Sequence, residues 1–308
     1  MREPAAHEAL VKTLQELYLA DDLTPPSESH SWSEQQLEVW FEHGGSVGGQ
    51  DLCARTTMTE VDVTIPRLTT SAFDEPLRGK LLWPSDARDQ AAIGVVWCSA
   101  NPGPKFGSEN MDSRIPMAIA SACRTHELPL LRFDYGGVRG SGNASEYGPS
   151  MLSPTTGMQC VEEAFDFLKS RCARVVIGGH SMGASMLLQA AVSRSPAAII
   201  SSGIGPAIFK ILPAEQRSQG EAHFHGQLAA LPAGQPKLFI VGDADKFSPK
   251  SLMEESVALV SEPKAHHVVT GAQHNFEGIP TLVDDAADIM VKFAIDSARD
   301  GRDRKPYE

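Results

Sequence analysis

The sequence predicts an α/β domain with a doubly wound, mostly parallel sheet that is covered by helices on both faces. Apolar, β-branched runs alternate with helical stretches over residues 91–298. Several of these runs are apolar at nearly every position, as strands buried on both faces require. The runs that predict strands are Ala91–Cys98, Leu128–Phe133, Arg174–Ile177, Ala197–Ser201, Lys237–Val241 and His266–Thr270. The stretches that predict helices are Met111–Thr125, Met158–Ser170, Ser185–Arg194, Pro249–Ser261 and Leu282–Ala298.

Two earlier segments predict an antiparallel pair at one edge of this sheet. Val61, Val63 and Ile65 alternate with polar residues, which is the pattern of a strand with one buried face. The segment Leu77–Trp83 follows after a turn and predicts the second strand of the pair. We therefore place the main domain at residues 59–308.

Residues 1–58 differ in composition and predict a helical, acidic extension. They contain ten acidic and three basic residues, a net charge of −7 out of −12 for the whole chain. Helical spacing at Ala5–Leu19 and a capping box at the start of Ser33–His43 predict two helices joined by a linker rich in proline and serine. Two short helices do not form a core of their own, so we expect them to dock on the main domain or on a protein partner.

Charge, hydropathy and cysteine usage exclude several classes of protein. The net charge of −12 argues against nucleic acid and anionic membranes as partners. The longest apolar run, Ala91–Ala100, is much shorter than a membrane span. The five cysteines are scattered and form no C-x-x-C pair, which favours reduced thiols and argues against a zinc site. We expect a cytoplasmic protein without a bound metal.

The pattern Gly-x-Ser-x-Gly, which can mark a nucleophilic serine, occurs twice in the chain. At Gly179–Gly183 the pattern follows a predicted strand and precedes a predicted helix, so Ser181 lies on a sharp strand-to-helix turn. At Gly44–Gly48 no strand precedes it, and the surrounding glycines predict a flexible loop. Only Ser181 has the setting in which this motif makes a nucleophile.

An acid should follow a later strand of the same sheet, since the partners of such a serine come in the order serine, acid, histidine. Asp243 and Asp245 both follow the strand predicted at Lys237–Val241. We favour Asp245, because the spacing Gly-x-x-Asp directs the fourth residue toward the histidine. Asp243 lies closer to the strand and is expected to bind the backbone of the turn or the N-terminus of a helix.

Three histidines lie near the last predicted strand. His266 and His267 fall within it and are expected to face opposite sides of the sheet. His274 follows a loop that contains a glycine, at the place where a general base is needed. The sequence therefore predicts His274 as the base.

A serine nucleophile also requires two backbone donors for the oxyanion that develops on the substrate. One should be the N–H of Met182, the residue after the nucleophile. The other is expected in the loop after the strand Ala91–Cys98. Pro102 and Pro104 of that loop have no N–H, so we favour Gly103, with Lys105 as the next candidate.

Residues 59–298 resemble the α/β-hydrolase superfamily in the motif around Ser181 and in the order of the acid and the histidine. Segment 101–108 is similar to the His-Pro-His-Pro-x-x-Gly-Gly loop of small esterase-like members, with both histidines and the last glycine replaced. Segment 132–142 is similar to their Arg-Phe-Asn-x-Arg-Gly-x-Gly motif, with the second arginine displaced. The resemblance implies an α/β-hydrolase fold, serine hydrolase chemistry and no cofactor.

The resemblance also implies a small cap segment, at about residues 206–235. Its apolar residues either line an acyl pocket or anchor the segment to the core. They are Phe209, Ile211, Leu212, Phe224, Leu228 and Leu231. His223 and His225 have the spacing of two ligands on one face of a strand, but no acidic or cysteine cluster accompanies them.

We expect a serine hydrolase that cleaves a small carboxylic ester or thioester, a small-molecule acyl substrate, through an acyl-enzyme on Ser181 (EC class 3.1). Neither a cofactor nor a metal is expected. The alternative is a non-catalytic protein of the same fold that uses residues 1–58 as an interaction surface.

Overall fold

The structure is a computed structural model that describes most of the predicted main domain. The described residues are 57–68, 75–85, 91–100, 109–138, 141, 154–204, 214–279 and 281–298. The predicted N-terminal extension, apart from residues 57 and 58, lies outside them. So do the candidate oxyanion residues Gly103 and Lys105 and the start of the predicted cap segment.

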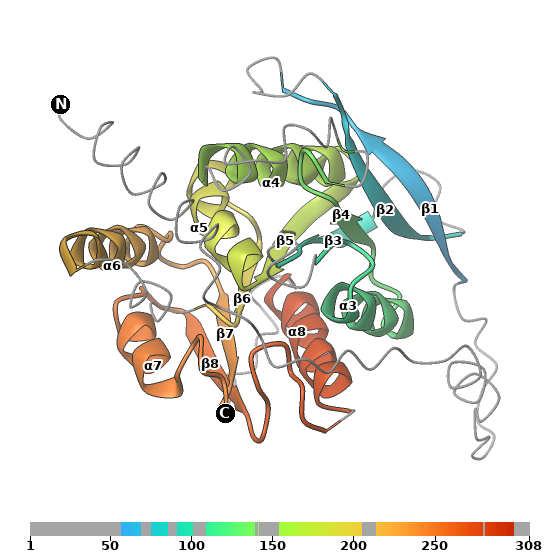
Figure 1. The fold of residues 1–308 in the computed structure, drawn as a ribbon. Coiled ribbons are helices and arrows are strands. Elements are labelled where there is room, and N and C mark those ends of the chain that lie inside the picture. Colours follow the sequence, from blue (N-terminus) through green and yellow to red (C-terminus); the bar gives the residue numbers. More distant parts are fainter. Residues whose placement is uncertain are drawn as a thin grey trace.

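Within the described residues, eight strands form one sheet in the order β1-β2-β4-β3-β5-β6-β7-β8 (Figure 1). The strand bounds are β1 Met58–Ile65, β2 Leu77–Pro84, β3 Ala91–Cys98, β4 Leu130–Phe133, β5 Cys172–His180, β6 Ala198–Ser202, β7 Lys237–Gly242 and β8 Lys264–Val269. β2 runs antiparallel to both β1 and β4, and all other neighbouring strands are parallel. The predicted fold class and the antiparallel pair at one edge are therefore confirmed.

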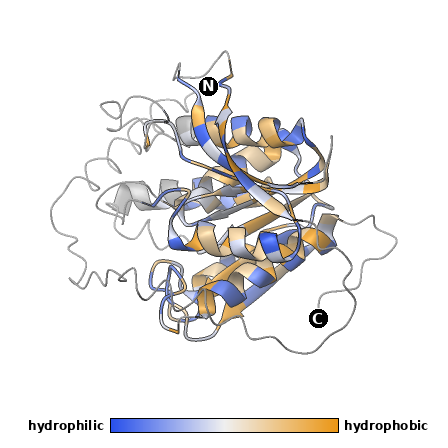
Figure 2. Cartoon of the chain, turned by 90° about the vertical axis from the view of Figure 1, so that its right-hand side faces the viewer, coloured by the Kyte–Doolittle hydropathy of each residue, from blue (hydrophilic) through white to orange (hydrophobic). Residues whose placement is uncertain are grey.

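Helices cover both faces of this sheet (Figure 1). The described helices are α3 Arg114–Thr125, α4 Pro154–Lys169, α5 Met182–Arg194, α6 Ala214–Ala229, α7 Lys250–Ala258 and α8 Leu282–Ala298. Side chains of α3 and α8 join one core cluster, and side chains of α4 to α7 join a second cluster on the opposite face. Figure 2 shows the apolar strands enclosed between helices of mixed polarity.

Three of the inner strands are buried along their whole length. Every residue of β4, β6 and β7 is buried, which explains why these runs lack the polar alternation seen in the edge strand β1. β5 extends beyond the predicted Arg174–Ile177 because its glycines also pair with β3 and β6. A Cβ at Gly178 would lie 2.6 Å from the Trp97 ring, so a side chain there would displace the indole.

The described part of the predicted cap contains one helix, α6. Phe224 and Leu228 of α6 are buried in the core cluster beside α5 and α7. In this part of the segment, apolar side chains anchor the helix to the core. His223 and His225 lie on a helix, where residues two apart do not share a face as they would on a strand. No cluster of potential metal ligands occurs among the described residues.

No helix in the described part of the chain is long and apolar enough to cross a membrane.

Candidate active site

Ser181 lies on a tight turn between the end of β5 and the start of α5. Its backbone has φ 53° and ψ −115°, a conformation that residues with a side chain seldom adopt. Such a conformation costs on the order of 1–3 kcal/mol and persists only where the surroundings enforce it. The turn thus lifts the Ser181 side chain away from the sheet and toward the loops that follow β7 and β8.

The two glycines of the motif allow this turn to close. A Cβ at Gly183 would lie 2.3 Å from the carbonyl oxygen of Cys98, and a Cβ at Gly179 would lie 2.8 Å from the backbone of Gly183. α5 therefore starts in direct contact with the end of β3. The carbonyl oxygen of Ser99, the residue after β3, would lie 2.5 Å from a Cβ at Gly183.

Ser181, His274 and Asp245 form a continuous hydrogen-bonded arrangement. Nε2 of His274 lies 3.0 Å from Oγ of Ser181, and Nδ1 of His274 lies 2.8 Å from Oδ2 of Asp245. The Asp245 side chain is fully buried, whereas that of His274 is 17% exposed. With its proton on Nδ1, His274 donates to the carboxylate and presents the Nε2 lone pair to the serine hydroxyl.

Backbone donors hold the Asp245 carboxylate in place. Oδ1 of Asp245 accepts hydrogen bonds from the N–H groups of Phe247 at 2.7 Å and Ser248 at 2.8 Å. Because Oδ1 is occupied in this way, Oδ2 is the oxygen that faces His274. The acid is oriented before any substrate binds.

Asp243 has a different role: it binds a backbone N–H, but in the loop after β8 and not in its own turn. Its Oδ1 accepts a hydrogen bond of 2.6 Å from the N–H of Gly271, in the loop that leads to His274. Next to it, a Cβ at Gly242 would lie 2.0 Å from the carbonyl oxygen of Ala272. The loops after β7 and β8 thus touch through their backbones, and this contact sets the distance between the acid and the histidine.

The structure separates the three histidines that the sequence places near the last strand. His266 and His267 lie in β8, the first half-buried and the second exposed. His274 alone of the three contacts Ser181 and Asp245.

Met182 is the first residue of α5. The first N–H groups of a helix have no partner within it, and they form the positive end of the helix dipole. The Met182 N–H is therefore suited to bind a developing oxyanion beside Ser181. Gly103 and Lys105 lie outside the described residues.

Comparison with known proteins by sequence matches part of the chain. No protein-family model matches the chain. An uncharacterized protein of Mycobacterium tuberculosis, found in two strains, is 28% identical over 193 residues, and the match covers 59% of this chain. The chain spans about 62% of the length of these relatives.

Solved structures match a larger part of the chain. The dienelactone hydrolase from Anabaena variabilis has a TM-score of 0.58 at 18% identity, over 78% of this chain and 98% of that protein. Est1E from Butyrivibrio proteoclasticus has a TM-score of 0.56 at 14% identity, over 76% and 98%. XC6422 from Xanthomonas campestris, described as an α/β serine hydrolase without a lid, has a TM-score of 0.55 at 17% identity, over 76% and 94%.

This chain has the α/β-hydrolase fold. In it the loops after β5, β7 and β8 carry Ser181, Asp245 and His274, so the residues that the sequence singles out meet at the carboxyl edge of the sheet.

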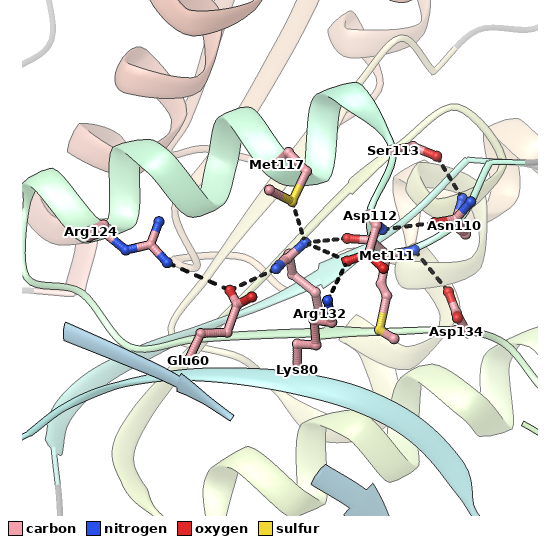
Figure 3. Close-up of polar contacts among 10 residues, drawn as sticks. All are labelled: Glu60, Lys80, Asn110, Met111, Asp112, Ser113, Met117, Arg124, Arg132 and Asp134. Atoms are coloured by element: carbon pink, nitrogen blue, oxygen red, sulfur yellow. Dashed lines mark hydrogen bonds and ion pairs between the residues drawn. The ribbon is translucent and has the colours of Figure 1, made fainter. Parts of the chain in front are cut away.

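Two residues of the second motif of the resemblance, Arg132 and Asp134, form polar contacts that stabilise this α/β-hydrolase fold (Figure 3). Arg132 of β4 is buried and donates from Nη2 to Oε2 of Glu60 at 2.7 Å, and from Nη1 to the backbone carbonyl of Met111. Asp134 accepts the N–H of Met111 at 2.8 Å. The motif therefore fixes the backbone of Met111 from two sides, three residues after segment 101–108.

The sequence patterns do not identify three residues around the site, which are His180, Phe247 and Asn275. His180 is buried and binds Ser202 and Asn275, and burial lowers its pKa to about 3. Phe247 is 61% exposed, and its ring centroid lies 5.0 Å from that of His274. All three are close in sequence to the predicted site residues: His180 precedes Ser181, Asn275 follows His274, and Phe247 lies two positions after Asp245. This closeness is the signal that could have identified them.

Proposed function

We propose that this chain is a serine hydrolase that cleaves a small carboxylic ester or thioester through an acyl-enzyme on Ser181. The observation that carries the proposal is the hydrogen-bonded sequence Ser181–His274–Asp245, with atom separations of 3.0 and 2.8 Å. A nucleophile, a base and an oriented acid at these distances are the parts that acyl transfer needs.

The reaction proceeds in two halves. Oγ of Ser181 attacks the carbonyl carbon while its proton passes to Nε2 of His274, and Asp245 stabilises the resulting imidazolium. The N–H groups of Met182 and Gly103 bind the oxyanion, with Lys105 as the alternative second donor. His274 then gives its proton to the departing alcohol or thiol. A water molecule, deprotonated by the same histidine, hydrolyses the acyl-enzyme.

The surroundings of His274 favour a substrate with an apolar part. Phe247 presents a largely exposed aromatic ring beside the imidazole. Two structures of the same fold, the dienelactone hydrolase and an esterase domain from Rhodothermus marinus, carry names that describe ester cleavage, which supports this reaction class. We propose a cytoplasmic enzyme that needs no cofactor or metal, and we keep residues 1–58 as a docking segment.

The alternative function is a non-catalytic protein of the same fold that binds a partner through residues 1–58. The alignment of Ser181 with His274 speaks against it. Ser181 keeps an unfavourable backbone conformation, and Asp245 keeps a buried charge, for which a pure scaffold has no use.

A fluorophosphonate probe, which reacts with activated serines, tests the proposal. Labelling is expected in the wild type and in Ser185→Ala, a control one helical turn away on α5, and is expected to disappear in Ser181→Ala. Labelling of Ser181→Ala would reassign the nucleophile. A wild type that is neither labelled nor able to hydrolyse a p-nitrophenyl ester series would favour the scaffold.

A further inference from the structure

A second imidazole is buried directly beside the candidate nucleophile. His180 is the last residue of β5, precedes Ser181 and is 1% exposed. Its Nδ1 lies 3.0 Å from Oγ of Ser202, and its Nε2 lies 3.2 Å from Oδ1 of Asn275. The His180 and His274 ring centroids are 5.0 Å apart. The reaction described above uses no group of His180.

The direction of each hydrogen bond in this group follows from its partners. The backbone N–H and the side-chain Nδ2 of Asn275 both donate to Glu277, at 3.0 and 2.9 Å. The amide oxygen of Asn275 is therefore the atom that faces His180, and it can only accept. Burial lowers the pKa of His180 to about 3, with a smaller contribution from His274, so the ring is neutral near pH 7.

A neutral ring carries one proton, which must lie on Nε2 to reach the oxygen of Asn275. Nδ1 then accepts the hydroxyl proton of Ser202. The four residues form one directed series: Ser202 donates to His180, His180 donates to Asn275, and Asn275 donates to Glu277.

This series runs alongside the hydrogen bond between the nucleophile and the base. His180 is bonded to Ser181 through the chain, and Asn275 to His274, so the contact of the outer pair lies parallel to that of the inner pair. Resting on the proposed function, we propose that His180 and Asn275 are positioning residues whose hydrogen bond holds Ser181 and His274 in reacting geometry. We call this hydrogen bond between His180 and Asn275 the brace; it links the end of β5 to the loop after β8.

Ser202 anchors the brace to the sheet. Its backbone carbonyl accepts the N–H of Ser181 at 2.9 Å, while its hydroxyl donates to His180. The following residue, Gly203, has φ +57°, and a Cβ there would lie 2.7 Å from Cε1 of His180 and 3.3 Å from Cε1 of His274. The missing side chain of Gly203, just after β6, therefore leaves room for the imidazole rings of His180 and His274.

The brace matters because His274 lies on a loop and is partly exposed. A misplacement of about 1 Å in a reacting group can cost about 100-fold in rate. The partly buried hydrogen bond between His180 and Asn275 restrains the histidine loop at the next residue. Its loss should therefore lower kcat and the rate of fluorophosphonate labelling, while KM stays unchanged because the proposed role of both residues is to position Ser181 and His274 and not to bind substrate.

Asn275→Ala and His180→Phe test the brace, since each removes one partner of the hydrogen bond. Each should lower kcat and labelling by about 10- to 100-fold with KM within about twofold. The double variant should be no worse than the single ones, since both remove the same interaction. His180→Gln, whose amide can donate and accept, should restore most of the rate. Gln273→Ala, which alters an exposed side chain of the same loop, is the matched control.

A spectroscopic measurement keeps the proposal separate from mere loss of folding. Histidine-selective ¹⁵N NMR of the wild type should show His180 as the neutral Nε2–H form at pH 7. An Nδ1–H form, or Asn275→Ala with wild-type kcat, would overturn the brace while the proposed function stands. A wild type that is not labelled at Ser181 would reject the proposed function, and with it any positioning role.

Discussion

Replacement of Asp245 by asparagine should trap His274 in the wrong protonation form. The N–H groups of Phe247 and Ser248 both point at Oδ1 of Asp245, at 2.7 and 2.8 Å. In Asp245→Asn these two donors require an oxygen at the same place. The amide nitrogen of the asparagine must then occupy the position of Oδ2, 2.8 Å from Nδ1 of His274.

The magnitude follows from this fixed orientation. The amide nitrogen can only donate, so Nδ1 of His274 must accept and the imidazole proton moves to Nε2. Nε2 then faces Ser181 with a hydrogen and cannot take the hydroxyl proton. The same defect in serine proteases lowers kcat about 10⁴-fold, which corresponds to about 5.5 kcal/mol of lost transition-state stabilisation.

Steady-state hydrolysis of p-nitrophenyl acetate and the rate of fluorophosphonate labelling measure this loss. Asp243→Asn is the matched control, because an asparagine oxygen can still accept the N–H of Gly271. Its activity should stay within a few-fold of the wild type. If Asp245→Asn kept more than a tenth of the activity while Asp243→Asn lost most of it, the assignment of the acid would be wrong.

Three further outcomes are expected. Burial lowers the pKa of His180 to about 3, so between about pH 6.5 and pH 3 the imidazole binds a proton in the unfolded state but not in the folded state. The free energy of unfolding should therefore fall by about 1.4 kcal/mol per pH unit as the pH falls from about 6 to 4. Urea titrations should show this slope as the difference between the wild type and His180→Gln, and identical pH dependence in both would contradict it. Arg132→Met should lower the free energy of unfolding by about 3 kcal/mol, since it removes a donor from the partly buried carboxylate of Glu60 and the carbonyl of Met111. Lys292→Met is the control, because the ion pair of Lys292 with Asp288 is exposed, and it should change the free energy of unfolding by less than about 1 kcal/mol. Phe247→Ala should raise KM about tenfold for long-chain or aromatic esters, because an apolar contact worth about 1.4 kcal/mol is lost, and should leave KM for acetate esters unchanged. Leu259→Ala, at an exposed apolar residue at the end of α7, is the control, and an equal effect on KM from this variant would refute the substrate contact of Phe247.

The strand pattern was predictable because the inner strands are mostly buried on both faces and are therefore largely apolar. β3 and α8 have the predicted bounds, Ala91–Cys98 and Leu282–Ala298. β5 was predicted too short, since glycines weaken a strand signal although pairing on both sides extends the strand to His180. A cap segment stays a prediction at about residues 206–235, and the contacts of its helix α6 with α5 and α7 depend on residues distant in sequence, which no local pattern predicts.

The local sequence by itself determined which residue types stand at the ends of the strands, and with them the order of Ser181, Asp245 and His274. Hydropathy periodicity and turn chemistry act over a few residues, so they predict elements and the loops between them. For Asp245 and Asp243 the sequence favoured one acid over the other, and the tertiary structure gave each its partner, His274 and the N–H of Gly271. Tertiary structure alone decided that His180 meets Asn275. These choices arise from contacts between residues 28 to 95 positions apart, where backbone packing and hydrogen-bond direction, and not local propensity, select the partner.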